Sequence, residues 1–313
     1  MSGVLAGFAT IGLIIGLGFL LAHLKVLNET AQHVLTRTSF FVASPALMIT
    51  VLGGTDVHRL LSADLIASLG SVAVAAALAV LLARLVWKRD SGETVIATFC
   101  GSYVNAGNLG LPIAAYALGD AALIAPMLLA QLLVLQPIGL AVLDGLTRTP
   151  HPDTSRGKRL LLRVSAPLRN PLAVASLIGL VLALTGVKLP LPINAPLTLV
   201  GGMAVPAMLI AYGISLRLGP GLGTGEPPGQ IAGLVGLKLV VQPVTAYLLG
   251  AYAVGLEGHD LLAVTVIAAL PTAQNVFTFA MRYDRAVILA RDVIFVATLL
   301  SVPAIVTITW LLS

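Results

Sequence analysis

The stretch Asn105-Ala106-Gly107-Asn108-Leu109-Gly110-Leu111-Pro112 interrupts a hydrophobic segment that is otherwise long enough to cross a membrane. A second interruption, Pro271-Thr272-Ala273-Gln274-Asn275, lies in a comparable segment of the second half of the chain. Proline removes a backbone donor, and asparagine supplies both donors and acceptors. In hydrocarbon, freed backbone groups are tolerated only where protein or a water-filled cavity covers them. Interrupted segments at matching places in two halves therefore predict the substrate site of a secondary transporter.

The composition indicates that most of the molecular surface faces lipid. The chain has 313 residues, of which 58% are hydrophobic and 10% charged, and its mean hydropathy is +1.01. Such a sequence cannot cover a water-soluble surface. The excess of basic residues is typical of membrane spans whose cytoplasmic ends collect Lys and Arg, and it does not call for a nucleic-acid partner.

Catalytic and metal-binding patterns are missing from the sequence. The single cysteine, Cys100, excludes an intramolecular disulfide and a cysteine metal cluster. The five histidines lack the spacing of metal ligands, and there is no HExxH or GxSxG motif. We therefore expect no enzymatic activity, no metal site and no cofactor.

Apolar blocks separated by polar breaks predict an all-α membrane protein with ten transmembrane helices. We place them near 4–24, 35–53, 63–87, 94–117, 122–146, 170–187, 195–217, 230–254, 259–281 and 286–312. All Lys and Arg except Arg59, Lys188 and Lys238 fall at the odd-numbered loops or the span ends beside them. Basic residues mark cytoplasmic loops, so both termini are expected in the periplasm of a bacterial inner-membrane protein.

The chain divides into two halves of five spans. Residues 1–146 form the first half, 147–169 a basic cytoplasmic linker, and 170–313 the second half. Because each half has an odd number of spans, the halves insert with opposite orientation, which predicts an inverted repeat. Nearly constant offsets in the sequence support the repeat: 167 positions for Asn108 to Asn275 and for Tyr116 to Tyr283, 166 for Pro137 to Pro303, and 161 for Pro45 to Pro206.

Three asparagines and two prolines at the interruptions are the candidate substrate-binding residues. Asn105, Asn108 and Asn275 supply the polar groups, and Pro112 and Pro271 are the predicted helix breakers. The amino end of a broken helix presents N–H groups and a positive dipole end, both of which attract a carboxylate. The alternative is that the asparagines cap half-helices or join neighbouring spans.

Lys238 is the only basic residue that we place inside a span, and a charge at that depth is a candidate functional group. In one interpretation it is a fixed cation that neutralises an anionic substrate or stands where a sodium ion would sit in a cation-coupled relative. In the other its ammonium group reaches the membrane interface. Neither interruption contains a carboxylate, so sodium coupling is not expected, and Asp292 beside Arg291 predicts a local ion pair in the last span.

Other small and polar residues within the predicted spans have two possible roles each. Gln131, Gln136 and Gln242 either line the transport path or bond between helices. The glycines of the first span at four-residue spacing suit close helix packing, either within the chain or across a homodimer. They are Gly3 and Gly7, and Gly12 and Gly16.

At the two interruptions the chain resembles the auxin efflux carrier family in its short prokaryotic form. Members of that family carry an asparagine- and proline-bearing crossover in the fourth span. In the ninth span they carry a Pro…Phe-x-x-Ala-x-x-Tyr pattern, which here is Pro271 followed by Phe277, Ala280 and Tyr283. The resemblance covers the whole chain. It implies the architecture of bile-acid symporters, in which a scaffold of spans one, two, six and seven faces a mobile bundle of the other six.

The resemblance also implies a function. Plant PIN relatives export the auxin anion, and bacterial members are linked with malate, malonate and other organic acids. We therefore expect a carrier that moves a small organic anion by alternating access, exporting it without sodium. The alternative is a sodium-coupled symporter of the bile-acid or arsenite-carrier type, which would need acidic or additional polar sodium ligands near the crossing.

Overall fold

The structure is a computed structural model that describes residues 2–54, 63–110, 113–114, 118–147, 171–219 and 221–312. Within these ranges every element is a helix. Pro112, Tyr116 and the predicted linker beyond Thr147 lie outside the described residues. The expected all-α class is therefore confirmed for the described part of the chain.

Six helical segments are long and apolar enough to cross a membrane: Glu29–Gly53, Asp64–Val86, Pro126–Leu146, Leu191–Leu218, Pro228–Val254 and Val287–Leu312. Three shorter apolar helices are Ala9–His23, Val174–Thr185 and Gly258–Ala268. A helix satisfies its own backbone hydrogen bonds, which makes long apolar helices stable in lipid. The fourth and ninth expected spans are each divided into two pieces, so neither forms one long helix.

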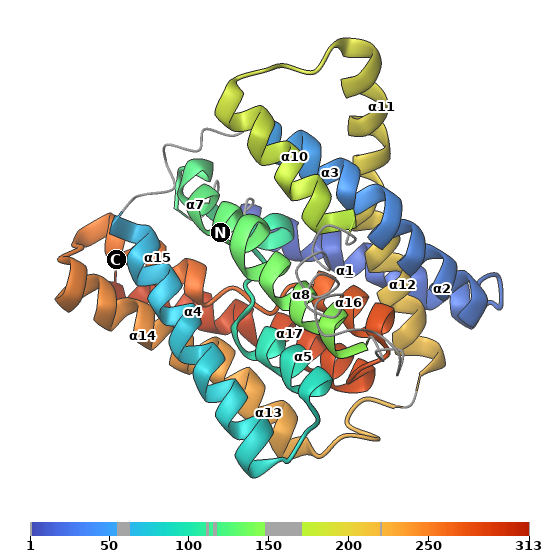
Figure 1. Ribbon diagram of the computed structural model, residues 1–313. Coiled ribbons are helices and arrows are strands. Elements are labelled where there is room, and N and C mark those ends of the chain that lie inside the picture. The colour runs from blue at the N-terminus through green and yellow to red at the C-terminus, as the bar shows by residue number, and fades with distance from the viewer. Residues whose placement is uncertain are drawn as a thin grey trace, which may run out of the picture.

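One set of helices, called here the first helix group, packs around α12 and α3. It consists of α1 (Ser2–His23), α2 (Glu29–Thr38) with the π-helical η1 (Ser39–Ala43) and α3 (Ser44–Gly53), α10 (Pro171–Thr185), α11 (Leu191–Gly202) and α12 (Ala204–Leu218). Helix α1 lies along α12, and α10 and α11 lie along α3. These helices occupy the upper and right parts of Figure 1.

The remaining elements form the second helix group, in which α4 packs against α5, α14 and α15, and α17 packs against α5 and α15. Its first half has α4 (Ala63–Leu81), η3 (Leu82–Val86), α5 (Ser91–Ser102), η4 (Ala106–Gly110), η5 (Ala121–Ile124), α7 (Ala125–Ala130), η6 (Gln131–Leu135) and α8 (Gln136–Thr147). Its second half has α13 (Pro228–Gly236), η8 (Leu237–Val241), α14 (Gln242–Leu248), η9 (Leu249–Val254), α15 (Gly258–Ala268), α16 (Asn275–Tyr283) and α17 (Val287–Leu312).

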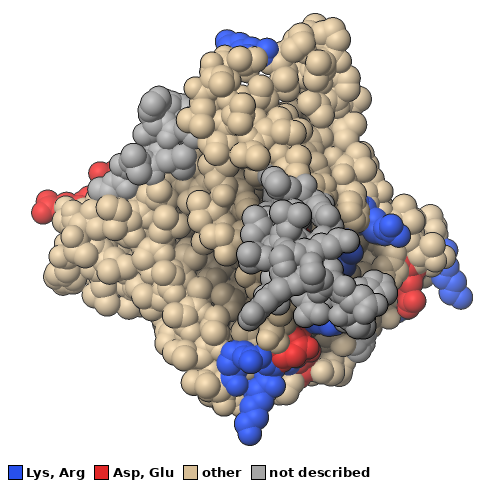
Figure 2. All heavy atoms as spheres, in the orientation of Figure 1, with Lys and Arg blue, Asp and Glu red and all other residues tan. Residues whose placement is uncertain are grey.

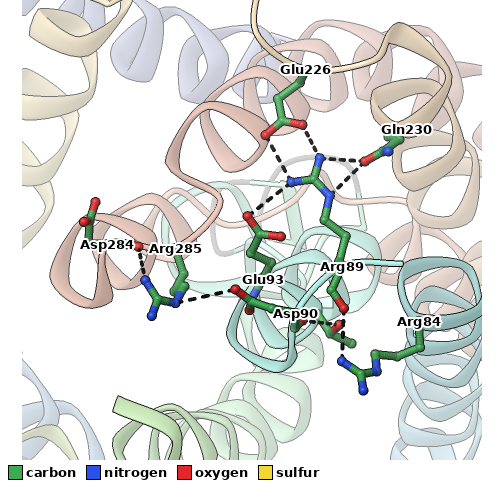
Figure 3. Close-up of polar contacts among 9 residues, drawn as sticks. Arg84, Arg89, Asp90, Glu93, Glu226, Gln230, Asp284 and Arg285 are labelled. Atoms are coloured by element: carbon green, nitrogen blue, oxygen red, sulfur yellow. Dashed lines mark hydrogen bonds and ion pairs between the residues drawn. The ribbon is translucent and has the colours of Figure 1, made fainter. Parts of the chain in front are cut away.

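Charged side chains gather at one end of the second helix group, where three loops meet. Arg89, between α4 and α5, forms an ion pair with Glu226 and donates to Gln230 Oε1 at 3.0 Å (Figure 3). Arg285, between α16 and α17, lies 4.0 Å from Asp90. On the face drawn in Figure 2, charged residues lie at the margins, and uncharged surface covers most of the area between them. Loops expected on one side of the membrane thus contact one another.

Close helix packing in the first group depends on glycines other than those expected. A Cβ on Gly213 would lie 2.1 Å from the carbonyl oxygen of Ile15, and one on Gly18 would lie 2.3 Å from that of Ile210. The backbones of α1 and α12 therefore approach each other only because both positions lack a side chain. By contrast, a Cβ on Gly12 or Gly16 would meet nothing within 4 Å. Gly18 and Gly213, and not Gly12 and Gly16, therefore allow the close helix packing within the chain.

Candidate functional site

The two interruptions of the sequence cross each other inside the second helix group. Val104 and Thr272 form an isolated antiparallel bridge between the break after α5 and the break after α15. The Asn105 N–H donates to the Pro271 carbonyl at 2.9 Å, and the Ala273 N–H donates to the Tyr103 carbonyl at 3.2 Å. Backbone groups that each break frees from its own helix are thus satisfied by the other break.

Helical structure resumes immediately after each break. The π-helical η4 begins at Ala106, and α16 begins at Asn275. The Asn105 Oδ1 accepts from the Asn108 N–H at 3.3 Å, so this side chain caps η4. At α16 the N–H groups of Val276 and Phe277 already donate to carbonyls one turn back, at 3.1 and 3.0 Å. Side-chain amides, rather than these backbone N–H groups, are therefore the polar groups that the site offers.

Gln274 joins the two breaks through its side chain. Its Oε1 accepts from the Asn105 Nδ2 at 2.7 Å and from the Asn108 Nδ2 at 3.3 Å. Gln274 is completely buried, and its Nε2 has no hydrogen-bond partner among the described residues. Sequence reasoning did not select Gln274, although its position beside Asn275 inside the second interruption was a usable signal.

A second amide cluster lies on the other side of the crossing. The Gln136 Oε1 accepts from the Tyr103 hydroxyl at 3.2 Å and from the Asn275 Nδ2 at 3.5 Å. The Gln131 Nε2 donates to the Val104 carbonyl at 2.9 Å, which supports the bridging residue. The Asn275 Oδ1 is buried and has no hydrogen-bond partner among the described residues. Tyr103, like Gln274, is a polar group of the crossing that sequence reasoning did not select.

These side chains face a cavity of about 240 Å³, called here the central cavity, which lies between the first and second helix groups. The first group contributes Leu47, Met48, Val51, Leu172, Val205 and Met208. The second contributes Tyr103, Asn105, Asn108, Gln131, Gln136, Asn275 and Phe279. The described residues that line this cavity include amides and apolar side chains but no Asp, Glu, Lys, Arg or His.

The predicted binding residues differ in how they meet this cavity. Asn108 and Asn275 line it and are partly exposed, whereas Asn105 is 1% exposed and its amide is already bonded at both ends. Pro271 lies in the second break, where its carbonyl accepts from Asn105. Pro112 lies outside the described residues. Gln131 and Gln136 line the cavity, and Gln242 does not.

Lys238 lies on the π-helical η8 and is completely buried, so its ammonium group does not extend to an interface. Its Nζ donates to the Gln242 Oε1 and to the Ala268 carbonyl, both at 2.8 Å. Ala268 is the last residue of α15, where a helix carries partial negative charge. Lys238 does not line the central cavity, so its side chain does not contact a ligand bound there.

One expectation about charge can be compared directly with the structure. Arg291 and Asp292 form the expected ion pair, with 2.6 Å between the guanidinium and the carboxylate. Among the described residues no group of three or more His, Cys, Asp or Glu side chains is placed to hold a metal ion. The described residues of the crossing present neutral amides, and the amine of Lys238 is bonded to Ala268 at the end of α15.

Residues 4–144 and 158–309 match the model of a family described as "Membrane transport protein". A protein of Rhizobium meliloti (strain 1021), named "Putative malonate transporter", is 27% identical over 308 residues, which is 96% of this chain and 92% of that protein. An "Uncharacterized transporter" of Methanothermobacter thermautotrophicus is 27% identical over 294 residues, 91% of this chain and 90% of that protein.

Proposed function

Since this chain belongs to the membrane transport protein family, we propose that it is a secondary carrier for a small organic anion. Membership confirms the resemblance to the auxin efflux carriers and makes the chain a multi-pass membrane transporter, not an enzyme. The proposal adds that the carrier works by alternating access, exports its substrate from the cytoplasm across the inner membrane, and is not coupled to sodium.

The observation that carries the proposal is a cavity that lies between two helix groups and contains the crossing of two broken helices. Broken helices of this kind line the substrate sites of many secondary transporters. In the proposed mechanism the first helix group is the scaffold, and the second moves past it. Because both groups line the central cavity, such movement changes its access from one side of the membrane to the other.

The lining favours an anion with one carboxylate and an apolar body. Asn108, Asn275 and Gln136 supply polar groups at one wall, while Leu47, Met48 and Phe279 are apolar. Burying an ionised group is costly unless it is paired or hydrogen-bonded, and the cost rises with each charge. The amides provide hydrogen bonds for one carboxylate, whereas a compact dicarboxylate such as malonate would bring a second charge that no cation among the described lining residues can pair with. We therefore propose an amphipathic monocarboxylate.

Export of such an anion needs no coupling ion. A monoanion that leaves the cell gains about 2.3 kcal/mol per 100 mV of negative-inside potential. An imported dicarboxylate would instead move against this field and would need a proton, another ion or an exchanged anion.

The proposal includes the inverted repeat of five plus five spans. The π-helical segments η3 and η9 begin at Leu82 and Leu249, which are 167 positions apart. This is the offset that relates Asn108 to Asn275 in the sequence. Val104 and Thr272, the bridging residues of the two breaks, are separated by nearly the same number of positions. Irregularities that recur in register support a duplicated unit.

The test is an electrical measurement on purified protein reconstituted on a solid-supported membrane. Malonate, succinate, hexanoate and phenylacetate are applied at one pH, with protein-free liposomes as the control for passive permeation. We expect saturable currents with hexanoate or phenylacetate and weaker ones, or none, with malonate and succinate. Saturable currents with malonate alone would contradict the proposed substrate class, and no current with any acid would contradict the carrier function.

A further inference from the structure

A second cavity, called here the basic cavity, lies at the end of the molecule where the charged side chains cluster. Its volume is about 300 Å³, and it is lined by His33, Thr36, Arg37, Phe40, Phe41, Met281 and Arg282. The first five belong to α2 and η1 of the first helix group, and the last two belong to α16 of the second. Like the central cavity, it therefore lies between parts proposed to move against each other.

The basic cavity contains two arginines that form no ion pair with any described residue. Within the described part of the chain no Asp or Glu lines this cavity, and neither Arg37 nor Arg282 has a carboxylate within 4.0 Å. Three other arginines at this end, Arg89, Arg285 and Arg291, each form an ion pair with a carboxylate. Arg37 and Arg282 are also exposed, so both guanidinium groups are available to an anion from solution.

Aromatic rings hold Arg282 in place without using its hydrogen-bond donors. Its Cζ lies 4.9 Å from the centre of the Phe41 ring and 5.8 Å from that of Phe40. A cation over a ring face is attracted by the π electrons. The N–H groups of a guanidinium lie along its edge, in the fork that matches a carboxylate. Arg282 is thus fixed in position and still has donors to offer.

A pair of buried aromatic rings lies between the basic cavity and the central cavity. Phe40 lines the first and Phe279 lines the second. Their ring centres are 6.4 Å apart with planes at 85°, and each side chain is 2% exposed. Phe40 comes from the first helix group and Phe279 from the second. Movement of the groups past each other would therefore separate the two rings.

We propose that the basic cavity is a second binding site for carboxylate anions, a cytoplasmic vestibule that collects the substrate before the Phe40–Phe279 pair opens. The identity of the anion and the direction of travel rest on the proposed function. The electrostatic attraction does not rest on the proposed function, because Arg37 and Arg282, which form no ion pair among the described residues, attract any small anion into the cavity. Lined by one sign of charge, such a cavity raises local anion concentration and encounter rates about tenfold or more at low salt.

The first test measures local anion concentration and needs no knowledge of the substrate. Met281→Cys is placed in a Cys100→Ala background, and its modification rates by anionic methanethiosulfonate ethylsulfonate and cationic methanethiosulfonate ethyltrimethylammonium are compared at low salt. The ratio of anionic to cationic rate should fall about tenfold when Arg37→Gln and Arg282→Gln are added. Salt near 1 M should also lower it, because the screening length is then only about 3 Å.

The matched control is Arg217→Gln, which removes one charge from the same end at a residue that does not line the cavity. It should leave the ratio unchanged. If Met281→Cys does not yield folded protein, His33→Cys is used, because His33 lines the same cavity, is exposed and does not contact Arg282 through a ring. A ratio that is the same with and without Arg37 and Arg282 would overturn the vestibule, whether or not any acid is transported.

The second test asks whether the vestibule serves transport. With phenylacetate supplied to the cytoplasmic side of oriented proteoliposomes, Arg37→Gln with Arg282→Gln should raise KM and leave kcat nearly unchanged, since the central cavity is intact. Phenylacetate binding from the periplasmic side should not change. An unaltered KM in the double variant would overturn the role of the vestibule in loading the substrate. Absence of transport by the wild-type protein would instead contradict the proposed function, and the thiol-reagent test would then decide alone whether the basic cavity collects anions.

Discussion

Asn105 and Asn108 are separated by one turn but have different surroundings. Both line the central cavity, but Asn105 is buried, caps η4 and bonds to Gln274, whereas Asn108 is partly exposed and makes one longer bond to the same oxygen. Capping and ligand binding, which the sequence left open for both, are thereby assigned to different side chains in our proposal. Gln274 links the two roles, because its position fixes the direction of both amides.

The first prediction separates these roles by substitution. Asn108→Ala should weaken phenylacetate binding by about one to two decades, since a hydrogen bond to a charged group contributes about 1.5–3 kcal/mol. Its melting temperature should change little. Asn105→Ala should instead lower the melting temperature, because a cap and a bond across the breaks are lost together. Melting temperature and affinity are measured on the same preparations, with Asn275→Ala expected to follow Asn108→Ala. Unchanged affinity in Asn108→Ala and Asn275→Ala would remove both from the binding site.

Lys238 places its side-chain amine at the carboxyl end of α15. Carriers with broken helices use unwound carbonyls and helix carboxyl ends to hold a coupling cation. Here the Lys238 Nζ already donates to the Ala268 carbonyl, so a donor of the protein occupies that end. This geometry supports the reading in which Lys238 stands at a cation position, and it supports sodium independence.

The second prediction follows from that position. Replacing sodium by choline at constant pH should leave wild-type phenylacetate currents unchanged, because no sodium ion is needed beside the crossing. Lys238→Ala should lower the current, since the Ala268 carbonyl and the Gln242 Oε1 lose their donor. Wild-type currents that disappear in choline would favour the alternative, a sodium-coupled symporter.

At the scale of elements, α1 and α12 depend on two glycines for their close contact. A side chain at Gly213 would collide with the backbone of Ile15, and backbone atoms cannot move aside as the end of a flexible side chain can. Gly213→Ala should therefore destabilise the protein by about 1–3 kcal/mol, the usual cost of overpacking. Its melting temperature should fall, while Gly12→Ala, at a site with nothing within 4 Å, should hardly alter it. Equal melting temperatures for the two variants would show that the helices can separate without cost.

The broken helices show what sequence reasoning could reach. Proline and asparagine signalled both interruptions, because they disturb a helix locally. The first break lies at Tyr103–Asn105, at the start of the predicted stretch and upstream of Pro112, because Val104 pairs with Thr272. A partner 168 positions away leaves no local signal. For the same reason Gln274, the lining by Leu47 and Met208, and the packing glycines of α1 and α12 were not selected.

At the scale of the whole molecule, the distribution of charge relates the fold to the membrane. Loops numbered one, three, seven and nine in the ten-span prediction meet at one end, through Arg217 with His23, Arg89 with Glu226, and Arg285 with Asp90. The unpaired arginines of the basic cavity lie at this end too. Lys188, by contrast, follows α10 and precedes α11 in the chain. The connection between these two helices is at the top of Figure 1. An excess of Lys and Arg marks the cytoplasmic side.

The last prediction is this orientation in the membrane. Two reporter cysteines are placed in a Cys100→Ala background. Thr224→Cys lies in the loop that contacts Arg89 through Glu226 and Asp292 through Gly223. Lys188→Cys lies in the connection between α10 and α11. A membrane-impermeant maleimide added to intact spheroplasts should label only the Lys188 position, and permeabilised spheroplasts should label both. A cysteine at Ser2, on the same side as Lys188 if ten spans are present, should follow the Lys188 position. Labelling of the Thr224 position in intact spheroplasts would show that the orientation is the reverse of the predicted one. The basic cavity would then lie on the periplasmic side, where it could not collect a cytoplasmic substrate for export.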